Sequence, residues 1–124
     1  KGFKICPLIC YDLRFPVWSR NNDDYDVLIY VANWPKKRIT AWDSLLQARA
    51  IENMSYCIGV NRIGVDSLGY EYIGHSSAFD SLGASLAFSD KEEIIYVTIT
   101  KEHINTTRNK LKFLEDRDSF NLIP

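Results

Sequence analysis

Apolar residues in the first third of the chain form two short runs, each long enough for one β-strand. In residues 3–10 (FKICPLIC) both alternating faces are mostly apolar, and Val27 to Ala32 (VLIYVA) is continuously apolar. Such runs are typical of parallel strands that are covered on both faces. Proline disfavours helical geometry in the residue before it, so we expect a short helix over Pro16 to Asn22, beginning at the proline.

A helical period follows in residues 40–53 (TAWDSLLQARAIEN). One stripe of this segment is formed by Trp42, Leu45, Leu46, Arg49 and Asn53. Thr40 and Asp43 resemble a capping box at its start. Arg49 is unexpected on this stripe, and we expect it either to extend to solvent or to pair with Glu52, three residues along the helix.

Beyond residue 54 the chain shows short strand patterns separated by turn residues. We expect strands at Ser55 to Asn61, Tyr70 to Ile73, Ser76 to Asp80, Ala84 to Phe88 and Glu93 to Thr100. A final helix is expected over Lys101 to Asn109, with Thr100 as its N-cap. The whole pattern predicts an α/β fold, namely a βαβ unit followed by antiparallel strands and a C-terminal helix. The apolar side chains of the tail, residues 111–124, make it a candidate for docking onto another subunit.

Composition excludes several classes of function. The 124 residues, 46% hydrophobic and 25% charged, suit one globular domain. A net charge of −1 gives no electrostatic support for binding nucleic acid or an anionic membrane, and no apolar run is long enough to cross a bilayer. Three irregularly spaced cysteines favour a reducing compartment, so we expect a cytoplasmic location and neither a disulfide scaffold nor a zinc site. The basic triplet 36–38 lacks a glycine-rich turn and is expected to be a solvated loop rather than a phosphate site.

Cys10 is the sharpest candidate for chemistry. It lies at the carboxyl end of the first expected strand, where open α/β sheets place their ligands. A nucleophilic thiol needs a nearby cation or base, and Arg14 is close enough in sequence to supply positive charge. The alternative is a buried structural cysteine, which is the reading we favour for Cys6 and Cys57.

The other polar residues do not supply an obvious base for this thiol. His75 lies in a Gly-His-Ser-Ser turn, and His103, in the first turn of the last expected helix, should be solvated. Asp12 is expected to make turn hydrogen bonds rather than to act as a base. The residues by themselves therefore leave Cys10 without a partner of known position.

Three collinear blocks nevertheless resemble the nitrilase, or carbon–nitrogen hydrolase, superfamily: PLICYDLRFP, VLIYVANWP and QARAIENMSYCIGVNRIG. The stretch GHSSAFDSLG resembles the hairpin of that family. The segments CYDLRFP and YVANWP are most similar to those of the omega-amidase branch, which hydrolyses ω-amides of 2-oxo dicarboxylic acids. The resemblance implies half of a nitrilase-type αββα sandwich, with residues 1–124 forming the C-terminal half of a carbon–nitrogen hydrolase domain.

The resemblance also implies a mechanism. The family uses a Glu–Lys–Cys triad and needs no metal or organic cofactor. Cys10 matches the nucleophile, and the backbone N–H of Tyr11 would help to hold the developing oxyanion. The glutamate and the lysine precede the cysteine in the family, and Lys1, Lys4 and Glu52 do not match their motifs. We therefore expect both groups to come from a missing N-terminal half, and we expect this chain to be inactive by itself.

The resemblance and the strand ends together suggest a binding pocket. Asn33 and Trp34 follow the second strand and are expected to line it. Arg14 is a candidate for binding a substrate carboxylate, and the alternative is a salt bridge to Asp12 or to another acidic group. The resulting hypothesis is hydrolysis of a small-molecule, non-peptide C–N amide through an acyl-enzyme on Cys10, in a homodimer. The alternatives are a carbamoyl or nitrile hydrolase of the same fold, or a non-catalytic binding or scaffold domain in which Cys10 is merely buried.

Overall fold

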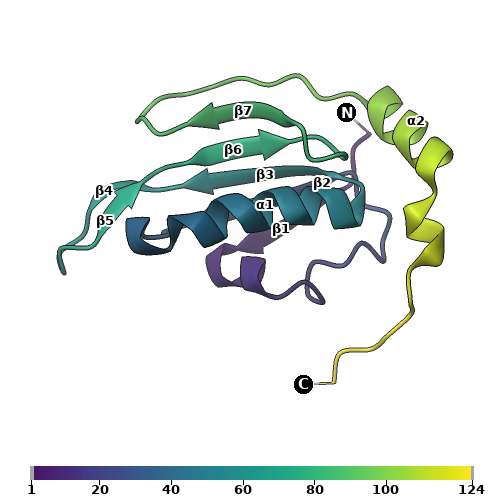
Figure 1. Cartoon of the computed structure of the whole chain (residues 1–124), viewed down its shortest axis with the longest axis horizontal. Coiled ribbons are helices and arrows are strands. Elements are labelled where there is room, and N and C mark those ends of the chain that lie inside the picture. The colour runs from purple at the N-terminus through teal and green to yellow at the C-terminus, as the bar shows by residue number, and fades with distance from the viewer. Residues whose placement is uncertain (1, 124) are drawn as a thin grey trace.

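The main sheet has the strand order β1-β2-β3-β6-β7 in the computed structural model, which describes residues 2–123. The parallel part consists of β1 (Ile5–Ile9), β2 (Val27–Ala32) and β3 (Tyr56–Asn61). The antiparallel part consists of β6 (Ser76–Phe79) and β7 (Ser85–Ser89), and a separate hairpin is formed by β4 (Ile63–Val65) and β5 (Glu71–Ile73). The two α-helices are α1 (Ile39–Asn53) and α2 (Lys101–Leu111). The predicted βαβ unit, β2–α1–β3, is confirmed, and so are the strands expected at the positions of β5, β6 and β7, whereas β4 was not expected (Figure 1).

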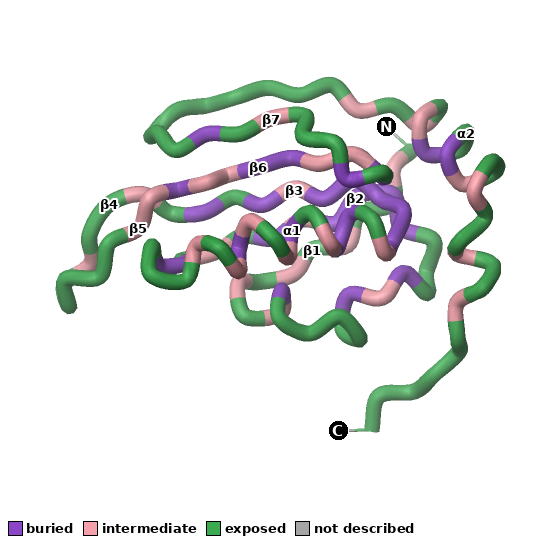
Figure 2. The backbone as a smooth tube through the Cα atoms, in the orientation of Figure 1, coloured by how far each residue is buried: buried purple, intermediate pink, exposed green. Residues whose placement is uncertain are grey.

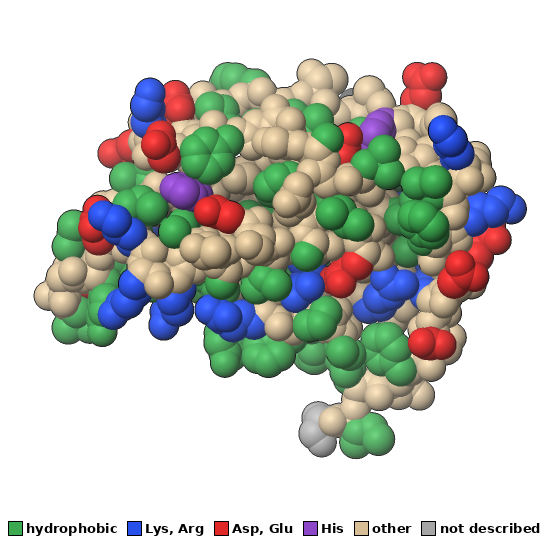
Figure 3. Space-filling model, viewed as in Figure 1, with side chains coloured by type: hydrophobic (Ala, Val, Ile, Leu, Met, Phe, Trp, Pro, Cys, Tyr) green, Lys and Arg blue, Asp and Glu red, His purple; other side chains and the backbone are tan. Residues whose placement is uncertain are grey.

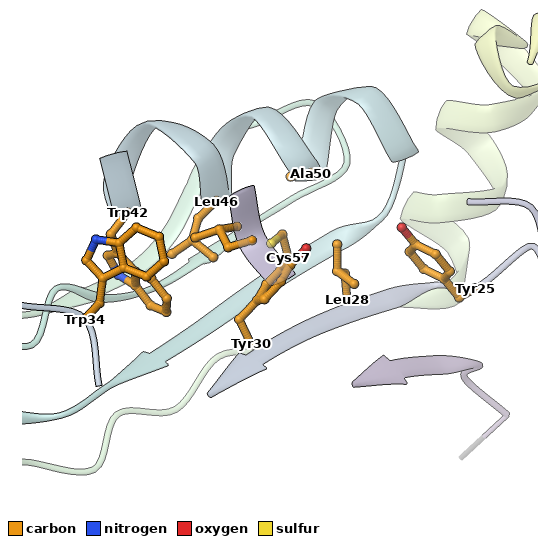
Figure 4. Packing of buried hydrophobic residues seen from close by; sticks show 9 residues of the cluster. Tyr25, Leu28, Tyr30, Trp34, Trp42, Leu46, Ala50 and Cys57 are labelled. Carbon is orange, nitrogen blue, oxygen red and sulfur yellow. The ribbon is translucent and has the colours of Figure 1, made fainter. Parts of the chain in front are cut away.

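Helix α1 covers one face of this sheet, and the main core lies between them (Figure 4). The buried members are Leu13, Tyr25, Leu28, Tyr30, Trp34, Trp42, Leu46, Ala50 and Cys57. Gly59 allows the close approach of helix and sheet, because an added Cβ would lie 2.4 Å from Cδ1 of Leu46 and 2.7 Å from Cζ2 of Trp42. The predicted stripe of α1 is confirmed as the buried side of the helix.

Helix α1 starts without the predicted capping box. Arg38 is the N-cap residue, and no side chain caps the first turn. A short 3-10 turn over Lys36–Arg38 leads directly into the helix, which places Thr40 inside it rather than at its boundary. Asp43 instead pairs with Nδ1 of His75 at 3.0 Å, so a tertiary contact has replaced the local one.

The opposite face of the sheet is apolar but only partly covered. Close to α2, Val27, Tyr56 and Ile104 form a second, smaller core. At the other end of the strands, Ile9, Val31 and Val60 lie side by side in register and are 67%, 50% and 51% exposed. The prediction that the first two strands are covered on both faces is therefore wrong within residues 2–123. Buried positions concentrate on the central strands β2, β3 and β6 (Figure 2).

The helix predicted over Pro16 to Asn22 is replaced by successive turns, with the N–H of Trp18 donating to the carbonyl of Phe15 at 3.1 Å. Helical geometry appears earlier, as a 3-10 helix over Cys10–Arg14. Asp12 stabilises the start of this helix by accepting from the N–H of Ile9 at 2.8 Å, which is the turn bond predicted for it. The local carboxylate thus begins the helix before the proline, and the residue preceding Pro16 is extended, as proline requires.

Residues 93–100 return from β7 to α2 as an extended segment that belongs to neither sheet (Figure 1). Ile94 and Tyr96 are 80% and 90% exposed, whereas Ile95 and Val97 are 40% and 36% exposed. The alternation in the sequence arises because one side of this extended segment is half-covered. The segment pairs with no strand of either sheet, so the strand prediction is wrong. The predicted last helix is confirmed, including its cap, because Oγ1 of Thr100 accepts from the N–H of His103 at 3.2 Å.

After α2, a short 3-10 helix (Phe113–Asp116) leads into an extended tail that runs away from the sheet (Figure 1). Arg117 ties this tail to the body through Oδ1 of Asp24 at 3.0 Å. Phe120 and Leu122 are 40% and 50% exposed, so the docking of this tail onto another subunit stays a prediction. Neither helix of the described chain has the length and apolar character needed to span a membrane.

Candidate active site

Cys10 lies where β1 ends and the 3-10 helix begins. Its φ of +42° falls in the left-handed region, which non-glycine residues adopt uncommonly and which recurs at functional sites. Its side chain is half-buried and lines a cavity of about 130 Å³ together with Tyr11, Arg14, Asn33, Trp34, Pro35 and Arg38. The structure therefore brings together all of the site residues expected from the sequence, and a ligand can reach the thiol.

A second and more open cavity, of about 520 Å³, also borders Cys10. Its lining includes Ile9, Val31 and Val60, the exposed apolar row on the uncovered face of the sheet. The uncovered face and the thiol are thus parts of one continuous surface. A polypeptide that packed against this row would lie beside Cys10.

Arg14 and Trp34 form one wall of the smaller cavity. Cζ of Arg14 lies 4.8 Å from the centre of the Trp34 ring, a cation–π distance. Trp34 is only 3% exposed, and its ring packs against Trp42 with 5.7 Å between centroids. Among residues 2–123, Arg14 forms no ion pair, so the alternative of an Arg14–Asp12 salt bridge is wrong for the chain as described.

Asn61, at the end of β3, holds the loop that carries Asn33 and Trp34. Its Oδ1 accepts from the N–H of Trp34 at 2.7 Å, and its Nδ2 donates to the carbonyls of Trp34 at 3.0 Å and Gly74 at 2.7 Å. Asn61 is not among the site residues predicted from the sequence. The available signal was an amide ending an apolar strand, level with the last residue of β2. Such a buried amide usually has specific partners.

The basic triplet 36–38 divides between two environments. Lys36 and Lys37 are exposed, as predicted for a solvated loop, and Nζ of Lys36 pairs with Oε2 of Glu71 at 2.8 Å. Arg38 is also exposed but lines the cavity of Cys10. No local pattern distinguishes Arg38 from its two basic neighbours.

Neither histidine lines a cavity that contains Cys10. The two histidine side chains lie well apart on the face shown in Figure 3. His75 pairs with Asp43, and its ring meets the edge of Phe88 with 4.9 Å between centroids. A cysteine–histidine pair at Cys10 is therefore not formed by the described residues.

His103 is half-buried rather than solvated, contrary to the prediction. Its Nε2 lies 2.9 Å from Oγ of Ser81, and its ring stacks on Tyr56 at 5.5 Å. The nearest carboxylate, that of Asp80, is 3.7 Å from the same ring nitrogen. In a Ser–His–Asp triad the serine and the carboxylate contact opposite nitrogens, so this cluster lacks the required geometry.

The other two thiols occupy core positions, as predicted. Cys57 is fully buried, and burial raises its pKa far above the usual range of a thiol. Burial also raises the pKa of the Cys6 thiol, and the negative charge of Asp23 adds to that effect. Because the thiolate is the reactive form, these shifts make both groups poor nucleophiles.

In residues 2–123 no three His, Cys, Asp or Glu side chains are grouped so that they could hold a metal ion. The side chains that line the cavity beside the Cys10 thiol include two arginines and the amide of Asn33.

Known proteins similar to this chain point to one family. A family model described as carbon-nitrogen hydrolase matches residues 1–109. Omega-amidase YafV from Escherichia coli (strain K12) is 44% identical over 124 residues, which cover 98% of this chain and 48% of the relative. The 2-oxoglutaramate amidase of Paenarthrobacter nicotinovorans is 40% identical over 111 residues, which cover 87% of this chain and 37% of the relative.

A solved structure shows the same fold. XC1258 from Xanthomonas campestris, described as a CN-hydrolase superfamily protein with an arsenic adduct in the active site, superposes with a TM-score of 0.95 at 40% identity. The match covers 98% of this chain and 49% of that one. The chain thus spans about half the length of the omega-amidase and of XC1258.

Proposed function

Because the chain belongs to the carbon–nitrogen hydrolase family, or nitrilase superfamily, we propose that it carries the nucleophile of an amidase-type enzyme and that Cys10 is this nucleophile. The observation that carries the proposal is the position of Cys10. Its half-buried thiol, on a left-handed backbone at the end of β1, opens on a cavity walled by Arg14 and Trp34. A scaffold role for Cys10 is disfavoured, because a purely structural thiol has no need of this access.

The proposed reaction is hydrolysis of an amide through an acyl-enzyme. The sulfur of Cys10 bonds to the amide carbon, the C–N bond breaks, ammonia leaves, and water then releases the acid. Tyr11 is the second residue of the 3-10 helix, and N–H groups at the start of a helix have no acceptor within it. Its backbone N–H is our candidate donor to the oxyanion, in line with the known use of backbone donors in acyl transfer.

The general base and the second oxyanion donor are proposed to come from outside this chain. In the family these are a glutamate, which takes the thiol proton and passes it to the leaving ammonia, and a lysine. We assign residues 1–124 to the C-terminal half of the catalytic domain and the missing groups to its N-terminal half. The chain alone should be inactive for this reason. No step of this mechanism requires a metal or an organic cofactor.

The uncovered sheet face is the proposed contact for that other half. Ile9, Val31 and Val60 form an exposed apolar row that ends at Cys10, and sheets in sandwiches pack about 10 Å apart through such rows. A second sheet at this distance would bring its own strand ends to the thiol. The αββα arrangement follows, with α1 as one outer layer.

We also propose that the complete protein forms a homodimer, which light scattering would measure.

The proposed substrate is a small amide that carries a carboxylate. Relatives of this chain are named omega-amidase and 2-oxoglutaramate amidase, and 2-oxoglutaramate has a carboxylate at the end remote from its amide. Arg14, stacked on Trp34 and without an acidic partner in the described chain, presents a fork-shaped donor that matches a carboxylate. Neutral carbamoyl compounds or nitriles would make no use of this group.

The test uses the complete protein, in which this chain is joined to the half that supplies the glutamate and the lysine. Ammonia release from 2-oxoglutaramate should fall by about a thousandfold or more for Cys10→Ala, as expected for removal of a nucleophile. Cys6→Ala is the matched control and should stay close to the parent rate. Retention of activity by Cys10→Ala would refute the proposal.

A further inference from the structure

We infer that Arg38 is a second specificity-determining cation of the Cys10 cavity, which acts with Arg14 on the carboxylate-bearing end of the substrate. This inference rests on the proposed function of Cys10. It assigns to Arg38 the recognition of an acceptor oxygen beside the one that Arg14 binds, such as the 2-oxo group of a 2-oxo acid.

Arg38 shares only part of its surroundings with the two lysines that precede it. Nζ of Lys37 lies 4.4 Å from the ring centre of Tyr70, and Lys36 pairs with Glu71, so both lysines contact the β4–β5 hairpin. These two residues line a different cavity, together with residues 68–71. Arg38 and Lys37 both line a third cavity against the hairpin, but of the triplet only Arg38 also lines the cavity of Cys10 and Arg14.

One buried indole contacts both arginines, Arg14 through its guanidinium and Arg38 through its backbone. Arg14 stacks on the face of the Trp34 ring, and Nε1 of the same ring donates to the backbone carbonyl of Arg38 at 2.8 Å. The N–H of Arg38 in turn donates to the carbonyl of Pro35 at 2.9 Å. The guanidinium of Arg14 and the backbone of Arg38 are therefore held by the indole before a substrate arrives, which lowers the entropy cost of binding.

The charge of this cavity is one-sided. Two arginines line it, and no aspartate or glutamate does. Within the described residues, the guanidinium groups of Arg14 and Arg38 form no ion pair with an acid. Guanidinium groups normally bind carboxylates or similar oxygen acceptors, so two unpaired ones beside a thiol favour an anionic substrate.

The cavity is small and lies directly beside the thiol. Cys10 and Asn33 line both this cavity, of about 130 Å³, and the more open one of about 520 Å³. The smaller cavity therefore offers a place for the end group of a short substrate. With the amide carbon at Cys10, the carboxylate end of a short substrate lies between Arg14 and Arg38.

The test compares Arg38→Gln with Lys37→Gln in the complete enzyme, using 2-oxoglutaramate and the neutral amide pentanamide. Arg38→Gln should lower kcat/KM for 2-oxoglutaramate by about 10- to 100-fold, mostly through KM, which is the range for losing a hydrogen bond to a charged group. The same variant should leave the rate with pentanamide within about threefold of the parent, because a neutral chain makes no use of the cation. Lys37→Gln should change neither value, and Arg38→Lys, which keeps the charge without the fork, should fall between Arg38→Gln and the parent.

Equal losses on the two substrates would show that Arg38 only supports the fold, and no loss on either would show that it does not bind the substrate. Both outcomes overturn the inference. If Arg38→Gln fails to fold, Arg38→Lys decides by the same substrate comparison. Cys10→Ala is measured in parallel: if it retains activity, the proposed function itself has failed, whereas its inactivity together with an unselective Arg38→Gln rejects Arg38 alone.

Discussion

Nη2 of Arg49 donates to the backbone carbonyl of Leu13 across 2.6 Å, which joins helix α1 to the short helix that begins at Cys10. Arg49 is only 3% exposed, and its Nη1 lies 3.0 Å from Oε1 of Glu52, so the predicted pair with Glu52 is confirmed and the extension to solvent is not. A buried guanidinium needs such partners to offset its lost hydration. The main core and the turn that carries the thiol are therefore tied by one side chain.

Replacement of Arg49 should loosen that turn. Arg49→Met leaves the Leu13 carbonyl without its buried donor, so the free energy of unfolding should fall by about 1–3 kcal/mol. Urea denaturation of the isolated chain measures this loss. In the complete enzyme we expect kcat to fall more than KM rises, because the turn that positions Cys10 has been freed. A stability loss without any change in kcat would restrict Arg49 to folding.

Asn61 should be needed for the shape of the proposed pocket. Asn61→Ala removes three hydrogen bonds at once and leaves the backbone N–H of Trp34 without its acceptor. We expect the free energy of unfolding to fall by about 2–3 kcal/mol and KM for the amide to rise. Asn105→Ala, at an exposed position of α2, is the control and should stay within about 0.5 kcal/mol of the parent. Similar behaviour of the two variants would contradict the proposed role of Asn61.

Alkaline pH should destabilise the chain. Burial raises the pKa of Cys57 and raises that of Tyr30 to about 12, so both groups stay protonated in the folded state. The unfolded chain loses the thiol proton above about pH 8.5, so it binds fewer protons than the folded chain and stability falls as pH rises. Stability from this source is complete below that pH. The slope approaches about 1.4 kcal/mol per pH unit for one such group.

Urea titrations in reducing buffer from neutral to alkaline pH measure this slope. Cys57→Ala should be less stable at neutral pH because it leaves a cavity, and its stability should decline less steeply between about pH 8.5 and 10. A decline as steep as that of the parent would place the alkaline sensitivity elsewhere.

The exposed apolar row should matter only when the other half of the domain is present. Val60 is 51% exposed in this chain, so Val60→Lys should change the unfolding free energy of the isolated chain by about 0.5 kcal/mol or less. In the complete protein the same lysine would be buried against the opposing sheet, and both stability and activity should collapse. Lys91→Ala, at an exposed turn, serves as a neutral control in both settings. Normal activity of Val60→Lys would argue against the sandwich arrangement.

The sequence predicted the parts of the fold that depend on local pattern. β2 was placed at its observed bounds because its apolar run is continuous, and the stripe of α1 is buried as expected. The cap at Thr100 was also predicted correctly, since N-caps are set by one residue and the next turn. What the pattern could not reveal is whether an apolar face is covered, because that depends on another layer, as the exposed side of β1 illustrates.

The misplaced elements and the missed site residues have a common origin in contacts between distant parts of the chain. Asp43 does not cap its helix but pairs with His75, 32 residues away in sequence. Asn61 accepts a hydrogen bond from the backbone of Trp34, 27 residues away. Arg38 and Lys37 differ only in their tertiary contacts, because Arg38 lines the Cys10 cavity and Lys37 does not. Cys10, Asn33 and Trp34 could be placed together from the sequence because they lie at the carboxyl ends of two adjacent parallel strands. Tyr11 was assigned through the family resemblance, and Arg14 through the match of its guanidinium to a carboxylate.

The left-handed backbone at Cys10 also restricts which residues can replace this cysteine. Side chains branched at Cβ are strongly disfavoured at positive φ, so threonine would be strained at this point, whereas serine or glycine would fit. An enzyme lineage built on this turn can exchange sulfur for an unbranched hydroxyl or lose its reactive atom altogether. A threonine nucleophile at this position would require a different backbone conformation.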